Sequence, residues 1–195
     1  YREETHVDPG SVTPTFVALP FYIDNWRWAG VPFYIRTGKR LERRVTEITI
    51  EFRQPPLRLF GRTCDQTKPN ILTFSIQPDE SITLSFSMKH PHGTSRIHEA
   101  DFTFNYKEAF HFSPHSTYER QLLDTMRGNL TLFARTDEIE TMWAIVDPII
   151  EYFDQMDTSH FPNYDPGGWG PDEADALLED TGRRWHIRQG GNQHA

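Results

Sequence analysis

One stretch decides how this chain folds: Asn25-Trp26-Arg27-Trp28-Ala29-Gly30-Val31-Pro32-Phe33-Tyr34-Ile35-Arg36-Thr37-Gly38-Lys39-Arg40-Leu41-Glu42-Arg43-Arg44. It begins as a turn rich in tryptophan, and the apolar run over 31–35 has the β propensity of a strand. Five basic residues then fall within nine positions: Arg36, Lys39, Arg40, Arg43 and Arg44. Because Gly38 permits a sharp turn where the strand ends, Lys39 and Arg44 can converge on one small anion, such as a phosphate.

The composition indicates one acidic domain with a substantial core. The 195 residues include 14 Phe, 7 Tyr and 5 Trp, which supply large apolar side chains. The net charge of −8 argues against a nucleic-acid partner, because only the basic cluster could release counterions. No apolar run approaches membrane-spanning length, so we expect no membrane partner. Cys64 stands alone, which fits a reducing compartment, and we expect a cytoplasmic protein.

The first part of the chain has the patterns of β-strands. The clearest case is 45–52, where apolar and polar residues alternate with period two. The segments 71–76 and 82–88 flank Gln77-Pro78-Asp79-Glu80-Ser81, which predicts an antiparallel hairpin with a five-residue loop. In all, we expect strands over 13–23, 31–35, 45–52, 71–76, 82–88 and 100–106.

The pattern becomes helical after these strands. We expect a helix from a cap at Ser116 or Thr117 to a stop at Gly128, and another capped by Thr136 that continues to 153. A last helix should cover 171–180, with Pro171 at its first position. Strands followed by helices predict an α+β fold with a large, mainly antiparallel β-sheet and helices packed on one face.

The opening stretch also resembles the glucose-6-phosphate dehydrogenase family, whose C-terminal domain carries a segment similar to Trp26-Arg27-Trp28-Ala29-Gly30-Val31-Pro32-Phe33 followed by Arg36-Thr37-Gly38-Lys39. Other segments resemble the family in its order: Thr13-Pro14-Thr15-Phe16-Val17-Ala18, Gln77-Pro78-Asp79-Glu80, Tyr118-Glu119-Arg120-Gln121-Leu122-Leu123-Asp124, Trp143-Ala144-Ile145-Val146-Asp147-Pro148 and Trp169-Gly170-Pro171. The resemblance covers nearly the whole chain. It implies a C-terminal substrate-binding and dimerisation domain over 1–195, reached by an arm over 1–12 from an upstream domain. It also implies a homodimer or a tetramer that assembles through the β-sheet.

The family oxidises D-glucose 6-phosphate to 6-phospho-D-glucono-1,5-lactone with NADP, in the oxidative pentose phosphate pathway. This sequence has no Gly-x-Gly-x-x-Gly fingerprint after a strand, and it lacks the family's Arg-Ile-Asp-His-Tyr-type segment with the catalytic histidine. The resemblance therefore implies that NADP is bound mainly by an N-terminal domain absent from this sequence. We expect no catalytic residue in this chain, and we predict that the isolated chain is inactive.

Three residues are candidates for binding glucose 6-phosphate. The resemblance implies phosphate contacts at Lys39 and Arg44 and a sugar contact at Gln77, whose amide can both donate and accept hydrogen bonds. For Gln77, a loop residue bonded to its own backbone is an equal alternative. Arg36 is a weak candidate for the structural NADP that some family members bind. Since Val45, Thr49 and Ser75 stand where such members have basic residues, we predict no structural nucleotide.

Histidines and tryptophans offer weaker signals. We interpret His90, His92, His98, His111 and His115 as scattered surface residues and expect no metal site. The segment 165–170 is rich in glycine but lacks the spacing of a phosphate loop, so we predict a tight turn. We interpret four tryptophans as packing anchors: Trp26, Trp28, Trp143 and Trp169.

Two functions from other classes remain open. The chain could be a non-catalytic regulatory or dimerisation module that pairs with a true dehydrogenase. It could also be a carbohydrate-binding β-rich module, which would need an exposed aromatic platform and would bind neutral sugars.

Overall fold

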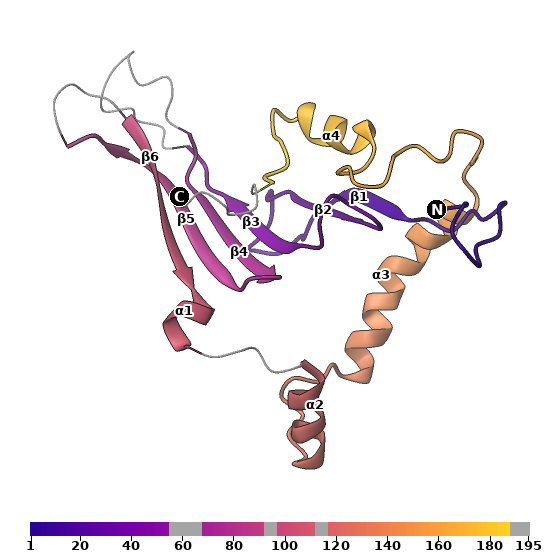
Figure 1. The fold of residues 1–195 in the computed structure, drawn as a ribbon, viewed down its shortest axis with the longest axis horizontal. Coiled ribbons are helices and arrows are strands. Elements are labelled where there is room, and N and C mark those ends of the chain that lie inside the picture. Colours follow the sequence, from indigo (N-terminus) through magenta and orange to yellow (C-terminus); the bar gives the residue numbers. More distant parts are fainter. Residues whose placement is uncertain (55–67, 92–96, 112–116, 188–195) are drawn as a thin grey trace. The chain divides into compact units, whose positions relative to one another are not determined.

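The structure is a computed structural model that describes residues 1–54, 68–91, 97–111 and 117–187 (Figure 1). Within the predicted span of 1–195, the chain divides into two compact units. Unit 1 comprises Tyr1–Arg43 and Asp124–Ala195, and unit 2 comprises Arg44–Leu123. Among the residues discussed above, Cys64, His92, His115 and Ser116 lie outside the described ranges.

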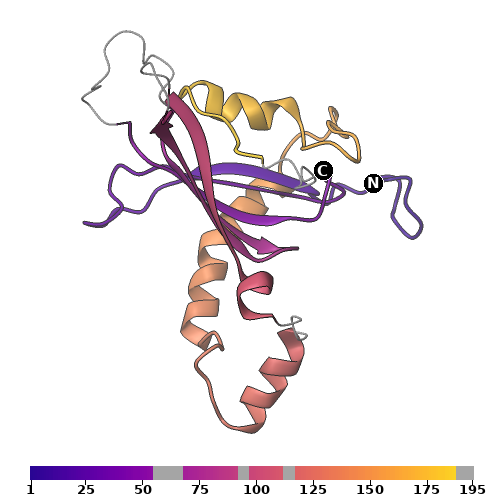
Figure 2. The same ribbon diagram turned by 60° about the vertical axis from the view of Figure 1, so that its left-hand side comes forward.

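Unit 2 contains a four-stranded antiparallel sheet. Its strands are β3 (Thr46–Glu51), β4 (Ile71–Gln77), β5 (Ser81–Lys89) and β6 (Ile97–Asn105), and they neighbour one another in chain order. Figure 2 shows the twist of these strands. The hairpin predicted between β4 and β5 is confirmed, with a shorter loop over 78–80.

The register places residues of one kind in rows across this sheet. One row consists of Ile50, Leu72, Leu84 and Phe102, and the next row, on the opposite face, consists of Thr49, Thr73, Thr83 and Thr103. Thr73 and Thr83 are buried, and the hydroxyls of Thr83 and Thr103 lie 3.0 Å apart. The alternation predicted from the sequence therefore produces one polar and one apolar face.

The apolar face of this sheet leaves large side chains exposed. Ile50 is 41% exposed and Phe102 70% exposed, and Ile48 and Phe104 in the neighbouring apolar row are also exposed. Contiguous exposed apolar patches are common at interaction surfaces of proteins.

A short helix follows β6 directly. Helix α1 (Tyr106–Phe110) begins after Asn105, whose side chain accepts a hydrogen bond from the Glu108 N–H at 3.2 Å, and it ends where His111 adopts φ +50°. The rings of Phe104, Tyr106 and Phe110 pack against one another. The sequence pattern missed α1 because the strand alternation continues to Tyr106.

Unit 1 is built on a two-stranded antiparallel ribbon. Strands β1 (Phe16–Phe21) and β2 (Phe33–Gly38) pair with Phe16 opposite Gly38. Helix α4 (Asp172–Glu179) contacts β1 and lies beside the ribbon in both views (Figures 1 and 2). Ala174 and Leu178 of α4 are buried, and the Trp185 indole N–H donates to the Ala174 carbonyl at 2.8 Å. Tyr34 of β2 meets the Trp185 ring edge-on, with 6.4 Å between centroids.

The remaining helices are α2 (Thr117–Met126) and α3 (Thr136–Asp154). The predicted stop after α2 is confirmed, because Gly128 has φ +68°. The predicted cap at Thr136 is wrong by one position. The N-cap is Arg135, whose backbone N–H donates to the Glu138 carboxylate at 2.9 Å. Similarly, Pro171 caps α4 instead of occupying its first position.

The predicted α+β class with antiparallel strands is confirmed. All six predicted strands are present within a few residues, and they hydrogen-bond in sheets of two and four. No helix in the described ranges combines the length and the hydropathy that crossing a membrane requires.

Candidate functional site

The structure separates the five clustered basic residues into those with an ion-pair or cation–π partner and those without one among the described residues. Arg36 belongs to the first group. Its side chain is only 10% exposed, and its guanidinium lies over the rings of Trp169 and Trp185, at 5.2 and 4.6 Å from their centroids. The same group donates to the Trp169 carbonyl at 3.4 Å and lies 4.0 Å from the Asp175 carboxylate.

Burial dominates the electrostatics of this arginine. It lowers the pKa of the Arg36 guanidinium below its usual value, while the Asp175 carboxylate acts in the opposite direction. Indole rings compensate for part of the lost hydration through cation–π attraction. The cation therefore faces two aromatic rings instead of solvent. This geometry does not suit a phosphate ligand, and the expected absence of a structural NADP at Arg36 stays a prediction.

Two further members of the basic cluster also have partners inside unit 1. The Arg40 guanidinium pairs with the Glu4 carboxylate at 2.8 Å, which ties the turn after β2 to the first residues of the chain. The Arg43 guanidinium lies 5.8 Å from the centroid of the Trp169 ring. Both charges are thus used within the fold.

Lys39 and Arg44 are exposed, as is Arg40, but they differ from Arg40 in their partners. Among the residues that the structure describes, neither side chain has an ion-pair partner. These are the two cations that the resemblance selects for phosphate.

The structure brings Arg44 and Gln77 to one end of the unit 2 sheet. Gln77 is the last residue of β4 and pairs with Thr46, two positions after Arg44. The register shifts between Thr46 and Glu47, which indicates a bulge at this end of the ladder. Gln77 is exposed, so its amide is accessible. Lys39 belongs to unit 1, one residue after β2.

Sequence reasoning missed the aromatic partners of Arg36. The segment 165–170 is a turn, as predicted, with Gly167 at φ +90° and Gly170 at φ +106°. The sequence did not indicate that this turn places Trp169 next to Arg36, which lies 133 positions earlier. Nothing in the local pattern signals such a pairing.

The tryptophans differ from one another in packing. Trp28 meets Phe33 edge-on at 5.4 Å, as expected of a packing anchor, and Trp169 covers Arg36. For Trp26 the prediction is wrong, because its side chain is fully exposed. Trp143 is also 55% exposed.

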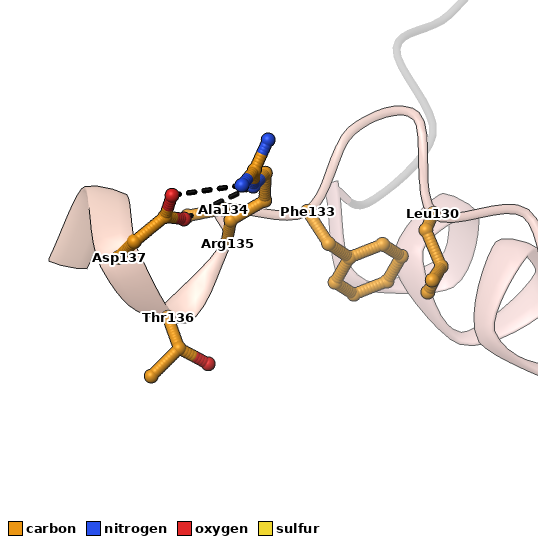
Figure 3. Close-up of a pocket in the computed structure, with 6 residues that line it drawn as sticks. All are labelled: Leu130, Phe133, Ala134, Arg135, Thr136 and Asp137. Atoms are coloured by element: carbon orange, nitrogen blue, oxygen red, sulfur yellow. Dashed lines mark hydrogen bonds and ion pairs between the residues drawn. The ribbon is translucent and has the colours of Figure 1, made fainter.

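A shallow hollow lies between α2 and α3, away from every predicted site residue in sequence (Figure 3). Its two charged groups pair with each other, because the Arg135 guanidinium donates to the Asp137 carboxylate at 2.8 and 3.0 Å. Its lining residues are Leu130, Phe133, Ala134, Arg135, Thr136 and Asp137. Apart from this ion pair, the only side-chain polar group in that lining is the Thr136 hydroxyl, so the hollow lacks the several convergent polar groups of a ligand site.

No three His, Cys, Asp or Glu side chains gather into a metal-binding group within the described ranges. The expected absence of a metal stays a prediction.

Comparison with known proteins gives a consistent result. The family described as "Glucose-6-phosphate dehydrogenase, C-terminal domain" matches residues 1–186. The glucose-6-phosphate 1-dehydrogenase of Mycolicibacterium smegmatis is 46% identical over 187 residues, covering 95% of this chain and 37% of that protein. That of Aggregatibacter actinomycetemcomitans is 44% identical, covering 97% of this chain and 37% of that protein.

Solved structures agree. The crystal structure of glucose-6-phosphate 1-dehydrogenase from Mycobacterium avium matches 98% of this chain and 39% of its own, with a TM-score of 0.79 and 32% identity. A glucose-6-phosphate dehydrogenase in complex with its substrate glucose-6-phosphate matches 93% of this chain and 37% of its own, with a TM-score of 0.76 and 28% identity. The chain therefore spans less than two fifths of these relatives. With the family profile covering almost the whole sequence, this chain belongs to the family of glucose-6-phosphate dehydrogenase C-terminal domains.

Proposed function

We propose that this chain is the substrate-binding and dimerisation domain of a cytoplasmic glucose-6-phosphate dehydrogenase. In that protein, D-glucose 6-phosphate is oxidised to 6-phospho-D-glucono-1,5-lactone. Lys39 and Arg44 bind the phosphate, and Gln77 binds a sugar hydroxyl. One observation carries the assignment: Arg36, Arg40 and Arg43 have ion-pair or cation–π partners in unit 1, and the two cations without such a partner among the described residues are the two that the family resemblance selects.

The chemistry of these side chains suits a phosphate monoester. The Lys39 ammonium and the forked Arg44 guanidinium can together satisfy the terminal oxygens of a dianion. Binding a remote phosphate positions the reacting carbon, so the contacts should influence turnover as well as affinity. Because Arg44 and Gln77 stand at one end of the same sheet, they suit the phosphate and a hydroxyl of one ligand.

The nicotinamide cofactor is assigned to residues outside this chain. The sequence contains no dinucleotide fingerprint, and Arg36 is enclosed by Trp169 and Trp185. When bound, NADP accepts the hydride that leaves C1 of the sugar. The role of this chain is to hold and orient the sugar phosphate during that step.

Dimerisation is assigned to the unit 2 sheet. Its apolar face exposes Ile48, Ile50 and Phe102, which a second copy would cover in a homodimer or a tetramer. No comparable argument supports a nucleic-acid partner, because three of the five clustered cations are already used within the fold.

The test compares the KM for glucose 6-phosphate of the complete protein that the source organism produces with the KM of Lys39→Ala and of the matched control Arg40→Ala. Hydrogen bonds to charged groups contribute about 1.5–3 kcal/mol, so Lys39→Ala should raise KM roughly 10- to 100-fold. Arg40→Ala removes a neighbouring cation that already pairs with Glu4 and should change KM little.

Each alternative outcome has a defined meaning. An unchanged KM in Lys39→Ala would remove the phosphate site. Equal affinity for glucose and glucose 6-phosphate would favour the carbohydrate-binding module. Absence of any dehydrogenase activity, from a product no longer than this chain, would favour the regulatory module.

A further inference from the structure

The loop between α3 and α4 holds the turn that carries Lys39. The hydroxyl of Tyr164 lies 3.1 Å from the backbone carbonyl oxygens of both Lys39 and Thr15, to which it can donate, and 3.1 Å from Thr15 Oγ1. The Lys39 N–H donates to the same Thr15 carbonyl at 2.8 Å. One phenol therefore bridges the residue before β1 and the residue after β2.

Backbone hydrogen bonds close the rest of this turn. The Gly167 N–H donates to the Arg40 carbonyl at 2.8 Å, and the Glu42 N–H donates to the Gly168 carbonyl at 2.9 Å. Arg40 itself has φ +53°, a left-handed conformation that is unfavourable for a non-glycine residue and that these contacts help to hold. The turn is therefore fixed by contacts 125 positions away in sequence.

The Tyr164 ring also has a packing partner, Phe16, which is itself closely surrounded. Its ring lies 5.5 Å from the ring of Phe16. Gly38 and Gly170 both approach Phe16 so closely that a Cβ on either would collide with the ring; at Gly38 the distance would be 2.6 Å. Removing only the hydroxyl should therefore leave the ring in place.

We infer that Tyr164 is a positioning residue: by holding the backbone of Lys39, it places the Lys39 side chain for phosphate binding. The inference rests on the proposed function, which assigns the phosphate to Lys39. Lysine is a flexible point charge, so much of its binding cost is the ordering of its stem. Because Tyr164 fixes the backbone from which the Lys39 side chain extends, less disorder is lost on binding. Supporting hydrogen bonds act in the same way on other binding side chains.

The test compares Tyr164→Phe, Lys39→Ala and the double variant, each made in the complete protein that the source organism produces. The matched control is Tyr34→Phe, which removes a tyrosine hydroxyl that contacts Thr181 Oγ1 at 3.4 Å instead of the Lys39 turn. Tyr164→Phe should raise the KM for glucose 6-phosphate about three- to tenfold, the effect of one hydrogen bond, and leave the KM for the nicotinamide cofactor unchanged. In the Lys39→Ala background, Tyr164→Phe should have no further effect on that KM.

The outcomes separate the inference from the function beneath it. If Lys39→Ala leaves KM unchanged, the phosphate site fails and this inference falls with it. If Lys39→Ala raises KM while Tyr164→Phe does not, or if the two effects multiply in the double variant, only the inference is overturned. Equal changes in both KM values would show a general structural role and would also overturn it. Should Tyr164→Phe fail to fold, Thr15→Val removes the partner hydroxyl and is expected to give a smaller rise in the same KM.

Discussion

Replacing Arg36 by alanine should loosen the segment that follows the Gly-rich turn. The guanidinium joins β2 to two rings, those of Trp169 and Trp185, and the side chain is almost fully enclosed. A largely desolvated cation–π contact stabilises by about 1–2 kcal/mol. The variant loses two such contacts and the packing of the arginine stem, but it also avoids the cost of desolvating the charge. The free energy that holds the α4 segment against β2 should therefore fall by roughly 2–3 kcal/mol.

Hydrogen exchange of α4 measures this loss locally. If opening of the segment governs exchange, the α4 amides should exchange about 30- to 150-fold faster in Arg36→Ala. Arg36→Met keeps the stem without the charge and should show a smaller effect. The control Arg184→Ala removes an exposed arginine of the same segment and should change little. Protection within threefold of the parent protein in Arg36→Ala would refute the reasoning.

A second arm of this experiment examines the alternative role of Arg36. If the residue served a structural NADP, adding NADP would raise the protection of α4 in the parent protein and not in Arg36→Ala. We expect no difference between the two proteins in this response, because the guanidinium already faces two indole rings.

Further variants test other parts of the structure. Arg44→Ala should raise the KM for glucose 6-phosphate about 10- to 100-fold, whereas Gln77→Ala, which removes neutral hydrogen bonds, should raise it only about two- to tenfold; the reverse order would contradict the assignment. Gly170→Ala should destabilise the protein by about 1–3 kcal/mol more than Gly182→Ala in thermal unfolding, because only the first Cβ meets the Phe16 ring. Ile50→Lys should shift the protein towards monomers in sedimentation, and Ser87→Lys, on the polar face beside Glu99, should not; equal dissociation in both would argue against the apolar face as the interface.

Local patterns predicted the elements well because short-range physics determines them. Strand β3 follows directly from the alternation over 45–52, and Gly128 ends α2 at the expected place. The missed helix α1 and the shifted cap of α3 are local as well, but each depends on one side chain that competes for a backbone N–H. Asn105 accepts from Glu108 at α1, and at α3 the Glu138 carboxylate accepts from Arg135.

The candidate site was less predictable because exposure is a property of the folded chain. In the sequence, Arg36 and Lys39 are equivalent cations on either side of Gly38. Their difference arises from Trp169 and Trp185, which lie far along the chain and which no spacing rule connects to β2. The family resemblance selected Lys39 and Arg44 for a different reason, and the burial of Arg36 is consistent with that choice.

The unit 2 sheet shows the same limit in another form. Its alternation predicts which side chains share a face but not which face is covered. In the threonine row Thr73 and Thr83 are buried, while in the apolar row Ile50 and Phe102 are exposed. A sheet normally turns its apolar side to a core. Since this one exposes that side in the chain considered alone, the face is suited to a surface that comes from outside it. This is the physical reason to propose that assembly uses the same domain to which substrate binding is assigned in the proposal.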